Sequence, residues 1–71
     1  MELKTTFGER FSEEMKYSKI SYAELARRLG VSKAVVSMYK SGKALPSLEK
    51  FAMICEILEV PADYLLGRKE V

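Results

Sequence analysis

Apolar residues recur every three or four positions along most of the chain, which is the spacing of amphipathic helices. The first repeat consists of Phe7, Phe11 and Met15 and predicts a helix over residues 7–17. No stretch shows the strict alternation of apolar and polar residues that is typical of a half-buried strand. The pattern therefore predicts an all-α protein.

The first helix also has a start signal. Thr6 and Glu9 form the sequence T-x-x-E, a capping box in which each side chain bonds to a free backbone N–H group of the first turn. Residues 1–5 would then be a loosely held arm in front of the helix.

The stretch from Ser21 to Gly42 predicts two short helices joined by a tight turn. Ser21 and Ser32 are of a type that favours the N-cap, and each opens a run with helical apolar spacing; Ser21 also forms S-x-x-E with Glu24. Gly30 and Gly42 stand where helices often end in a left-handed residue. The residues expected to face inward are Leu25, Ala26, Leu29, Val36 and Tyr39.

Two further helices are predicted after this stretch. Ser47 caps the fourth helix, and Pro61 opens a short fifth helix at a position where its missing N–H costs no hydrogen bond. Glu59 stands at the end of the fourth helix, where a left-handed residue would cost about 1 kcal/mol, so this end is expected to be strained or differently shaped. The apolar positions expected to face inward on the fourth helix are Leu48, Phe51, Ala52, Ile54, Cys55 and Leu58.

The 71 residues are expected to form one domain over residues 1–71, with a core of about residues 6–67 and short flexible ends. A chain of this length buries only about 60% of its unfolded surface, which predicts modest stability and leaves little room for an enzyme cleft.

The net charge is only +2, but its distribution is uneven. No acidic residue lies between Glu24 and Glu49, whereas five basic residues do, and the rest of the chain carries seven basic and ten acidic residues. A polyanion would be attracted to the basic segment. A solvated basic helix face is the alternative interpretation. The five basic residues are Arg27, Arg28, Lys33, Lys40 and Lys43.

The candidate chemistry is sparse. With no histidine and a single cysteine, the sequence offers no zinc ligand set and no pair of nucleophile and base, so we expect no metal, no cofactor and no enzyme activity. Cys55 lies within an apolar helical stripe and is expected to be a small buried hydrophobe. No apolar run of membrane length and no signal peptide is visible, so we expect no membrane contact and a cytoplasmic protein.

The order L-A-x-x-L-G-V-S, S-x-Y, S-G-K and P-S-L resembles the phage repressor and Cro type of helix-turn-helix domain, the XRE-like family. The resemblance covers about residues 7–67. The resemblance implies a compact five-helix, lambda-repressor-like domain in which the second and third helices form the helix-turn-helix. It further implies a bacterial or phage-encoded protein that binds double-stranded DNA.

Family positions assign candidate contacts. Side chains on the outer face of the third helix would meet base edges; these are Lys33, Ala34, Ser37 and Met38. Phosphate contacts would come from Tyr22, Ser32, Ser41 and Lys43, with Arg28 and Lys40 as further candidates. The ring of Tyr22 has an alternative role, which is to shield the core.

One departure from the family pattern concerns an ion pair. Many members pair an arginine late in the first helix with a glutamate in the third, and here the matching residues are Met15 and Lys40. Because both charges are absent together, no unpaired charge would be buried. We expect Lys40 to turn toward Glu14 or toward a phosphate.

The resemblance implies a sequence-specific transcription regulator, a repressor that acts as a homodimer on a two-fold symmetric operator. No ligand pocket fits in the remaining residues, so we expect no small-molecule ligand. The expected dimer surface consists of Val60, Pro61, Tyr64 and Leu65. The apolar outer face at Ala34, Val35 and Met38 leaves an alternative open, in which the helix-turn-helix is a scaffold for an antitoxin-like or adaptor module that binds protein.

Overall fold

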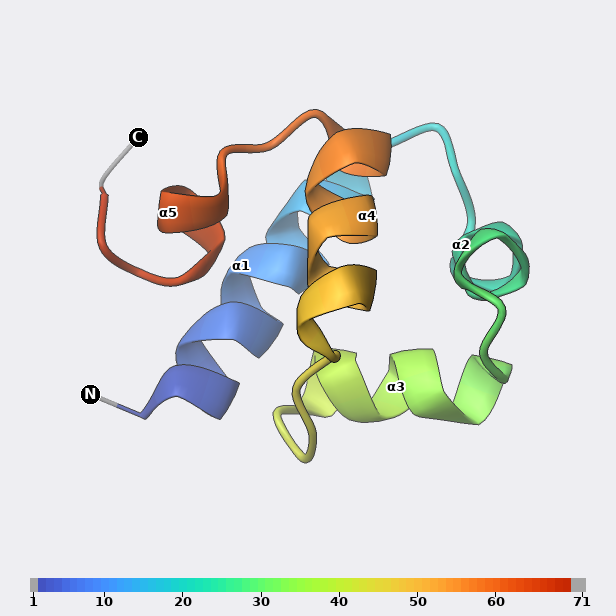
Figure 1. Cartoon of the computed structure of the whole chain (residues 1–71), viewed down its shortest axis with the longest axis horizontal. Coiled ribbons are helices and arrows are strands. Elements are labelled where there is room, and N and C mark those ends of the chain that lie inside the picture. Colours follow the sequence, from blue (N-terminus) through green and yellow to red (C-terminus); the bar gives the residue numbers. More distant parts are fainter. Residues whose placement is uncertain (1, 70–71) are drawn as a thin grey trace.

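Five helices make up the regular structure of residues 2–69, the part of the chain that the computed structural model describes (Figure 1). All described regular elements are α-helical, which confirms the predicted all-α class. None of the described helices combines the length and the apolar character that crossing a membrane requires. The helices are α1 (Leu3–Tyr17), α2 (Tyr22–Leu29), α3 (Lys33–Ser41), α4 (Leu48–Leu58) and α5 (Ala62–Leu65).

Helix α1 begins earlier than predicted. It starts at Leu3 after Glu2, whose side chain makes no capping hydrogen bond, and Thr6 lies inside the first turns with its N–H bonded to the Glu2 carbonyl at 3.0 Å. The predicted arm over residues 2–5 and the capping box at Thr6 are therefore wrong; Met1 lies outside the described residues. The physical reason is that half-buried Leu3 stands four residues before Phe7 and extends the apolar stripe by one turn.

The core is built around the aromatic face of α1. Phe7 and Phe11 are fully buried and stack with ring centroids 5.4 Å apart, and the Tyr39 ring of α3 meets both edge-on at 6.5 Å. Such edge-to-face pairs add to the stabilisation that burial alone provides. The predicted inward residues of α2 and α3 are all buried; they are Leu25, Ala26, Leu29, Val36 and Tyr39.

Helix α4 buries a narrower stripe than predicted. Ser47 caps it, with its hydroxyl accepting from the Lys50 N–H at 3.2 Å, and Ile54 is fully buried. Leu48, however, is 84% exposed, and Ala52 is also exposed, so both inward assignments are wrong. The helix has its first turn at the edge of the domain, and helical spacing does not reveal where the neighbouring helices stop covering a stripe.

The end of α4 is left-handed, which is the strained one of the two alternatives that the sequence left open. Glu59 has φ 56° and ψ 48°, and the following N–H of Val60 bonds to the Cys55 carbonyl at 3.0 Å. This turn directs Val60 into the core. Pro61 was predicted to be the first residue of α5. It is instead the N-cap, and the helix begins one residue later, at Ala62.

An unpredicted contact holds the C-terminal part of the described chain against α1. One guanidinium nitrogen of Arg10 (Nη1) donates to the carbonyl oxygens of Tyr64 and Lys69, both at 2.8 Å, and the group lies 4.6 Å from the Tyr64 ring centroid. These partners are more than fifty residues from Arg10 in sequence, so no local pattern could have indicated them.

Candidate nucleic-acid interface

The turn between α2 and α3 is defined by its caps. The hydroxyl of Ser21 accepts from the Glu24 N–H at 3.1 Å, and that of Ser32 accepts from the Val35 N–H at 3.2 Å, as predicted. Gly30 ends α2 with φ 73° and ψ 30°, a left-handed conformation that glycine adopts without a steric penalty. Backbone hydrogen bonds close this end and fix the path from α2 into α3.

Helix α3 presents one buried and one exposed face. Val36 and Tyr39 are buried, whereas a second set of side chains is exposed to solvent. We call this set the recognition face; its members are Lys33, Ala34, Ser37 and Met38. The predicted inward and outward division of α3 is thus confirmed, and Val35 lies half-buried between the two faces.

Close backbone contact with α1 fixes the C-terminal end of α3. Gly8 is buried in α1, and a Cβ atom added there would lie 2.9 Å from the Tyr39 carbonyl oxygen and 3.0 Å from that of Lys40. Gly42 then ends α3 with φ 80°, and the Lys43 N–H bonds back to the Met38 carbonyl at 2.9 Å. The recognition face is therefore carried on a rigid support.

The basic segment is partly neutralised from within. Glu24 accepts hydrogen bonds from Arg27, one of them from Nε at 2.9 Å, and from Arg28 Nε at 3.1 Å. These bonds, that from Arg27 first, lower the pKa of Glu24 to about 2. A full capping box would require the Glu24 carboxylate to accept a hydrogen bond from the Ser21 N–H. Here the carboxylate accepts from the two arginines instead. The charge available for an anion is concentrated on the lysines of α3 and the loop that follows it.

Lys40 makes a contact that the sequence did not suggest. Its ammonium nitrogen lies 4.9 Å from the ring centroid of Tyr22, and that ring meets Phe11 edge-on at 6.1 Å. Lys40 therefore lies on Tyr22 and not against Glu14, which corrects one of the two predicted arrangements. The half-buried Tyr22 ring packs on the core, as the alternative interpretation of this residue proposed.

Tyr22 and Lys40 also border a small hollow between the start of α2 and the outer side of α3. We call it the α2–α3 hollow; it has a volume of about 170 Å³ and is lined by Tyr22, Lys33, Ser37 and Lys40. Two residues predicted to contact bases thus share one concave surface with two predicted to contact phosphate.

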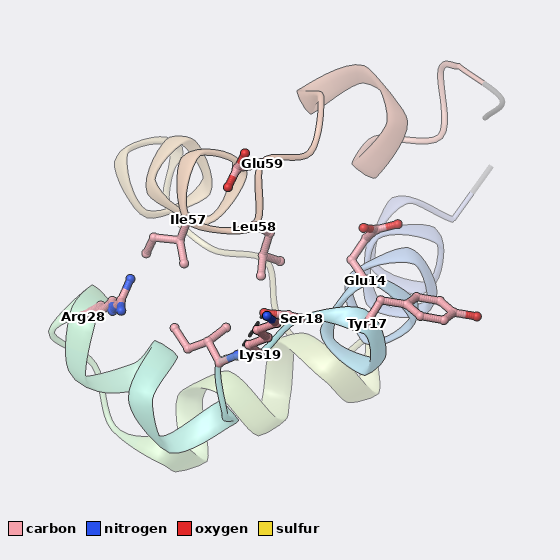
Figure 2. A pocket seen from close by; sticks show the side chains of 9 residues that line it. Glu14, Tyr17, Ser18, Lys19, Arg28, Ile57, Leu58 and Glu59 are labelled. Atoms are coloured by element: carbon pink, nitrogen blue, oxygen red, sulfur yellow. Dashed lines mark hydrogen bonds between the residues drawn. The ribbon is translucent and has the colours of Figure 1, made fainter.

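The other predicted phosphate contacts are spread around α3. Ser32 keeps its hydroxyl hydrogen available because its oxygen acts as the acceptor in the cap, whereas the Ser41 hydroxyl donates to the Met38 carbonyl at 3.3 Å. Lys43 is exposed in the loop after α3. Arg28 lies beside Ile57 at a different pocket, of about 340 Å³, so the structure does not bring it into the α2–α3 hollow (Figure 2).

The predicted dimer residues differ in exposure. Leu65 has no exposed surface and Val60 is buried, so both support the core. Pro61 is exposed, and Tyr64 is half-buried beneath the Arg10 guanidinium. Of the four, only Pro61 and part of Tyr64 offer surface to a partner.

Candidate chemistry of other kinds is limited. In residues 2–69, no three histidine, cysteine, aspartate or glutamate side chains are placed to hold a metal ion together. Cys55 lies half-buried against the core, less deeply than predicted, and its burial raises the pKa of its thiol. A thiol with a raised pKa is a poor nucleophile near neutral pH.

Two capped helices, a glycine turn and an exposed face on the second helix define the class of helix-turn-helix domains. A family model described as helix-turn-helix matches residues 13–65, and the chain belongs to this family. The chain is 33% identical over 60 residues to the cryptic phage CTXphi transcriptional repressor RstR of Vibrio cholerae, covering 84% of this chain and 54% of the relative. It is 36% identical over 62 residues to the HTH-type transcriptional regulator AnsR of Bacillus subtilis, covering 87% and 53%.

The fold is shared with a solved structure. The solution structure of the SOS-response transcriptional repressor LexA from Eubacterium rectale superposes with a TM-score of 0.88 at 21% identity, over 100% of this chain and 76% of the other. The chain spans about half the length of RstR and AnsR.

Proposed function

We propose that this chain regulates transcription by binding double-stranded DNA, with α3 in the major groove and α2 across the backbone. The observation that carries the proposal is the recognition face, a set of exposed side chains on a helix whose orientation is fixed by caps and by contact with α1. A bare helix fits the major groove, and a second helix that contacts the backbone sets its angle.

Repression at an operator is the regulatory mode we propose. RstR is named a transcriptional repressor, and the similarity extends over most of this chain. A protein that occupies an operator competes with other proteins for the same DNA, which requires binding and no catalysis.

We further propose that two copies bind a two-fold symmetric site. One recognition helix contacts only a few base pairs, and half-sites in such operators lie about 34–36 Å apart. The longest extent of the described chain is 28 Å, so two copies fit on adjacent half-sites along one side of the duplex. Pro61 and the exposed part of Tyr64 are the proposed contact between them.

Selection from a pool of random duplexes at moderate salt tests the proposal. We expect enrichment of a sequence with two-fold symmetry and half-sites one helical turn apart, and sedimentation of the complex as two chains per duplex. Retention without an enriched sequence would show that binding is only electrostatic and would contradict sequence-specific regulation.

A second candidate function is supported by one observation. Met38 is 42% exposed on the recognition face, one helical turn after exposed Ala34. Exposed apolar groups of this kind also suit a protein partner, as in an antitoxin-like or adaptor module. Tight binding to a protein that is insensitive to salt, without measurable affinity for any duplex, would favour this function over DNA binding.

A further inference from the structure

We propose that the α2–α3 hollow holds one phosphate group of the DNA backbone. Lys33 and Ser37 bind this phosphate together with Lys40, while Ala34 and Met38 read the bases. This inference rests on the proposed DNA binding and divides the recognition face into two rows with different tasks. Sequence position alone assigns all four residues to base contacts.

The geometry of α3 places three polar side chains along one line. Lys33, Ser37 and Lys40 are spaced by four and then three residues, so they lie in one row along the helix. This row lines the hollow, and Tyr22, the first residue of α2, closes its other side. The start of α2 is the end whose backbone N–H groups and helix dipole favour an anion.

The charge of the hollow suits a phosphate. Two basic side chains, those of Lys33 and Lys40, line the hollow, and no acidic residue lines it. Neither Lys33 nor Lys40 forms an ion pair with any residue of the described part of the chain. Glu24, the acidic residue in the first turn of α2, is already bonded to Arg27 and Arg28.

The hollow is also preorganised. The Tyr22 ring is held by Phe11, and the Lys40 ammonium lies 4.9 Å from that ring, which positions the charge without neutralising it. Ser37 is exposed, and its hydroxyl makes no side-chain hydrogen bond within residues 2–69. Two ammonium groups and a hydroxyl are suitable donors for the oxygens of one phosphate.

The consequence concerns sequence readout. A lysine bound to a backbone phosphate does not reach a base edge, so readout passes to Ala34 and Met38 in the neighbouring row of α3. Both are apolar and can contact the methyl group of thymine. The predicted operator therefore has thymine at the positions below these two side chains.

Phosphate ethylation interference on the selected duplex tests the inference with Lys33→Gln, Ser37→Ala and Lys40→Gln. All three residues are exposed, and circular dichroism melting checks that each variant folds. We expect each variant to lose interference at the same phosphate of each half-site, with base preference unchanged. For Lys33→Gln, affinity should fall about tenfold for every sequence alike, and the salt slope should fall by about 0.9.

Lys43→Gln is the matched control, because Lys43 lies in the loop beyond α3 and outside the hollow. It should lose interference at a different phosphate. Replacing thymine by deoxyuridine at the enriched positions removes only the methyl group. At the position read by Met38, this replacement should lower the affinity of the wild-type protein for the duplex but leave that of Met38→Ala unchanged.

The inference would be overturned if Lys33→Gln changed the preference at one base pair and kept every phosphate contact. DNA binding itself would then still stand. A wild-type protein that retains no duplex would instead refute the proposed function, and the inference with it.

Discussion

Substituting Gly8 by alanine adds one methyl group at the closest approach of α1 and α3. The new Cβ would lie 2.9 Å from the Tyr39 carbonyl oxygen, 3.0 Å from that of Lys40 and 3.2 Å from the Gly42 nitrogen. All three neighbours are backbone atoms, which cannot rotate away as the end of a side chain can. Ordinary contact begins near 3.4 Å, so the two helices would have to separate by about 0.5 Å.

The sign of the change in stability separates local from tertiary effects. Replacing glycine by alanine inside a helix stabilises it by about 1 kcal/mol when nothing else changes. Overpacking a tight contact costs about 1–3 kcal/mol, and here the rigid backbone neighbours favour the upper part of this range. We therefore expect Gly8→Ala to lower the free energy of unfolding by about 1–2 kcal/mol and Tm by about 4–16 °C.

Thermal and urea unfolding followed by circular dichroism measure this effect. Thr5→Ala is the control, because Thr5 is exposed in the same helix and its substitution should change the free energy of unfolding by less than about 0.5 kcal/mol. A Gly8→Ala variant more stable than the wild type would show that helix propensity dominates and that α1 and α3 are not in backbone contact.

Three further predictions concern the helix ends and their charges. Glu59→Gly should stabilise the protein by about 0.5–1 kcal/mol in urea unfolding, because glycine adopts the left-handed end of α4 without the strain of a side chain; an unchanged midpoint would show that this end is unstrained. Ser32→Ala should destabilise by about 1 kcal/mol and Ser32→Gly by only a few tenths, since the cap to the Val35 N–H is lost; equal values would contradict the cap. The hydrogen bonds from Arg27 and Arg28 lower the pKa of Glu24 from 4.5 to about 2, so their stabilisation is complete above pH 4.5 and is lost as the pH falls toward 2. The midpoint of Glu24→Gln should therefore vary less between pH 5 and 2 than that of the wild type, and parallel curves would refute the assignment.

The helix-turn-helix was predictable because its signals are local. A serine cap bonds to a backbone N–H three residues away, and a left-handed glycine closes a helix within one turn, so Ser21, Ser32, Gly30 and Gly42 could be placed from sequence alone. Helical periodicity likewise separated the buried face of α3 from its exposed face.

The same local rules failed where a helix meets the edge of the domain. Thr6 has the sequence of a cap, but Leu3 packs one turn earlier, and the helix extends to include it. Leu48 has the spacing of a core residue, yet no neighbouring helix covers it. In both cases the packing partners, which the pattern does not contain, decided the outcome.

The sequence by itself thus determined that the described chain is helical, how α2, α3 and α4 are capped and which face of α3 is exposed. Only the tertiary structure placed Lys40 on Tyr22, Arg10 against the carbonyl of Tyr64, and Lys33 and Ser37 around one hollow. The physical reason is distance along the chain. Capping and periodicity act within one or two turns, whereas these contacts join different helices and depend on how those helices cross.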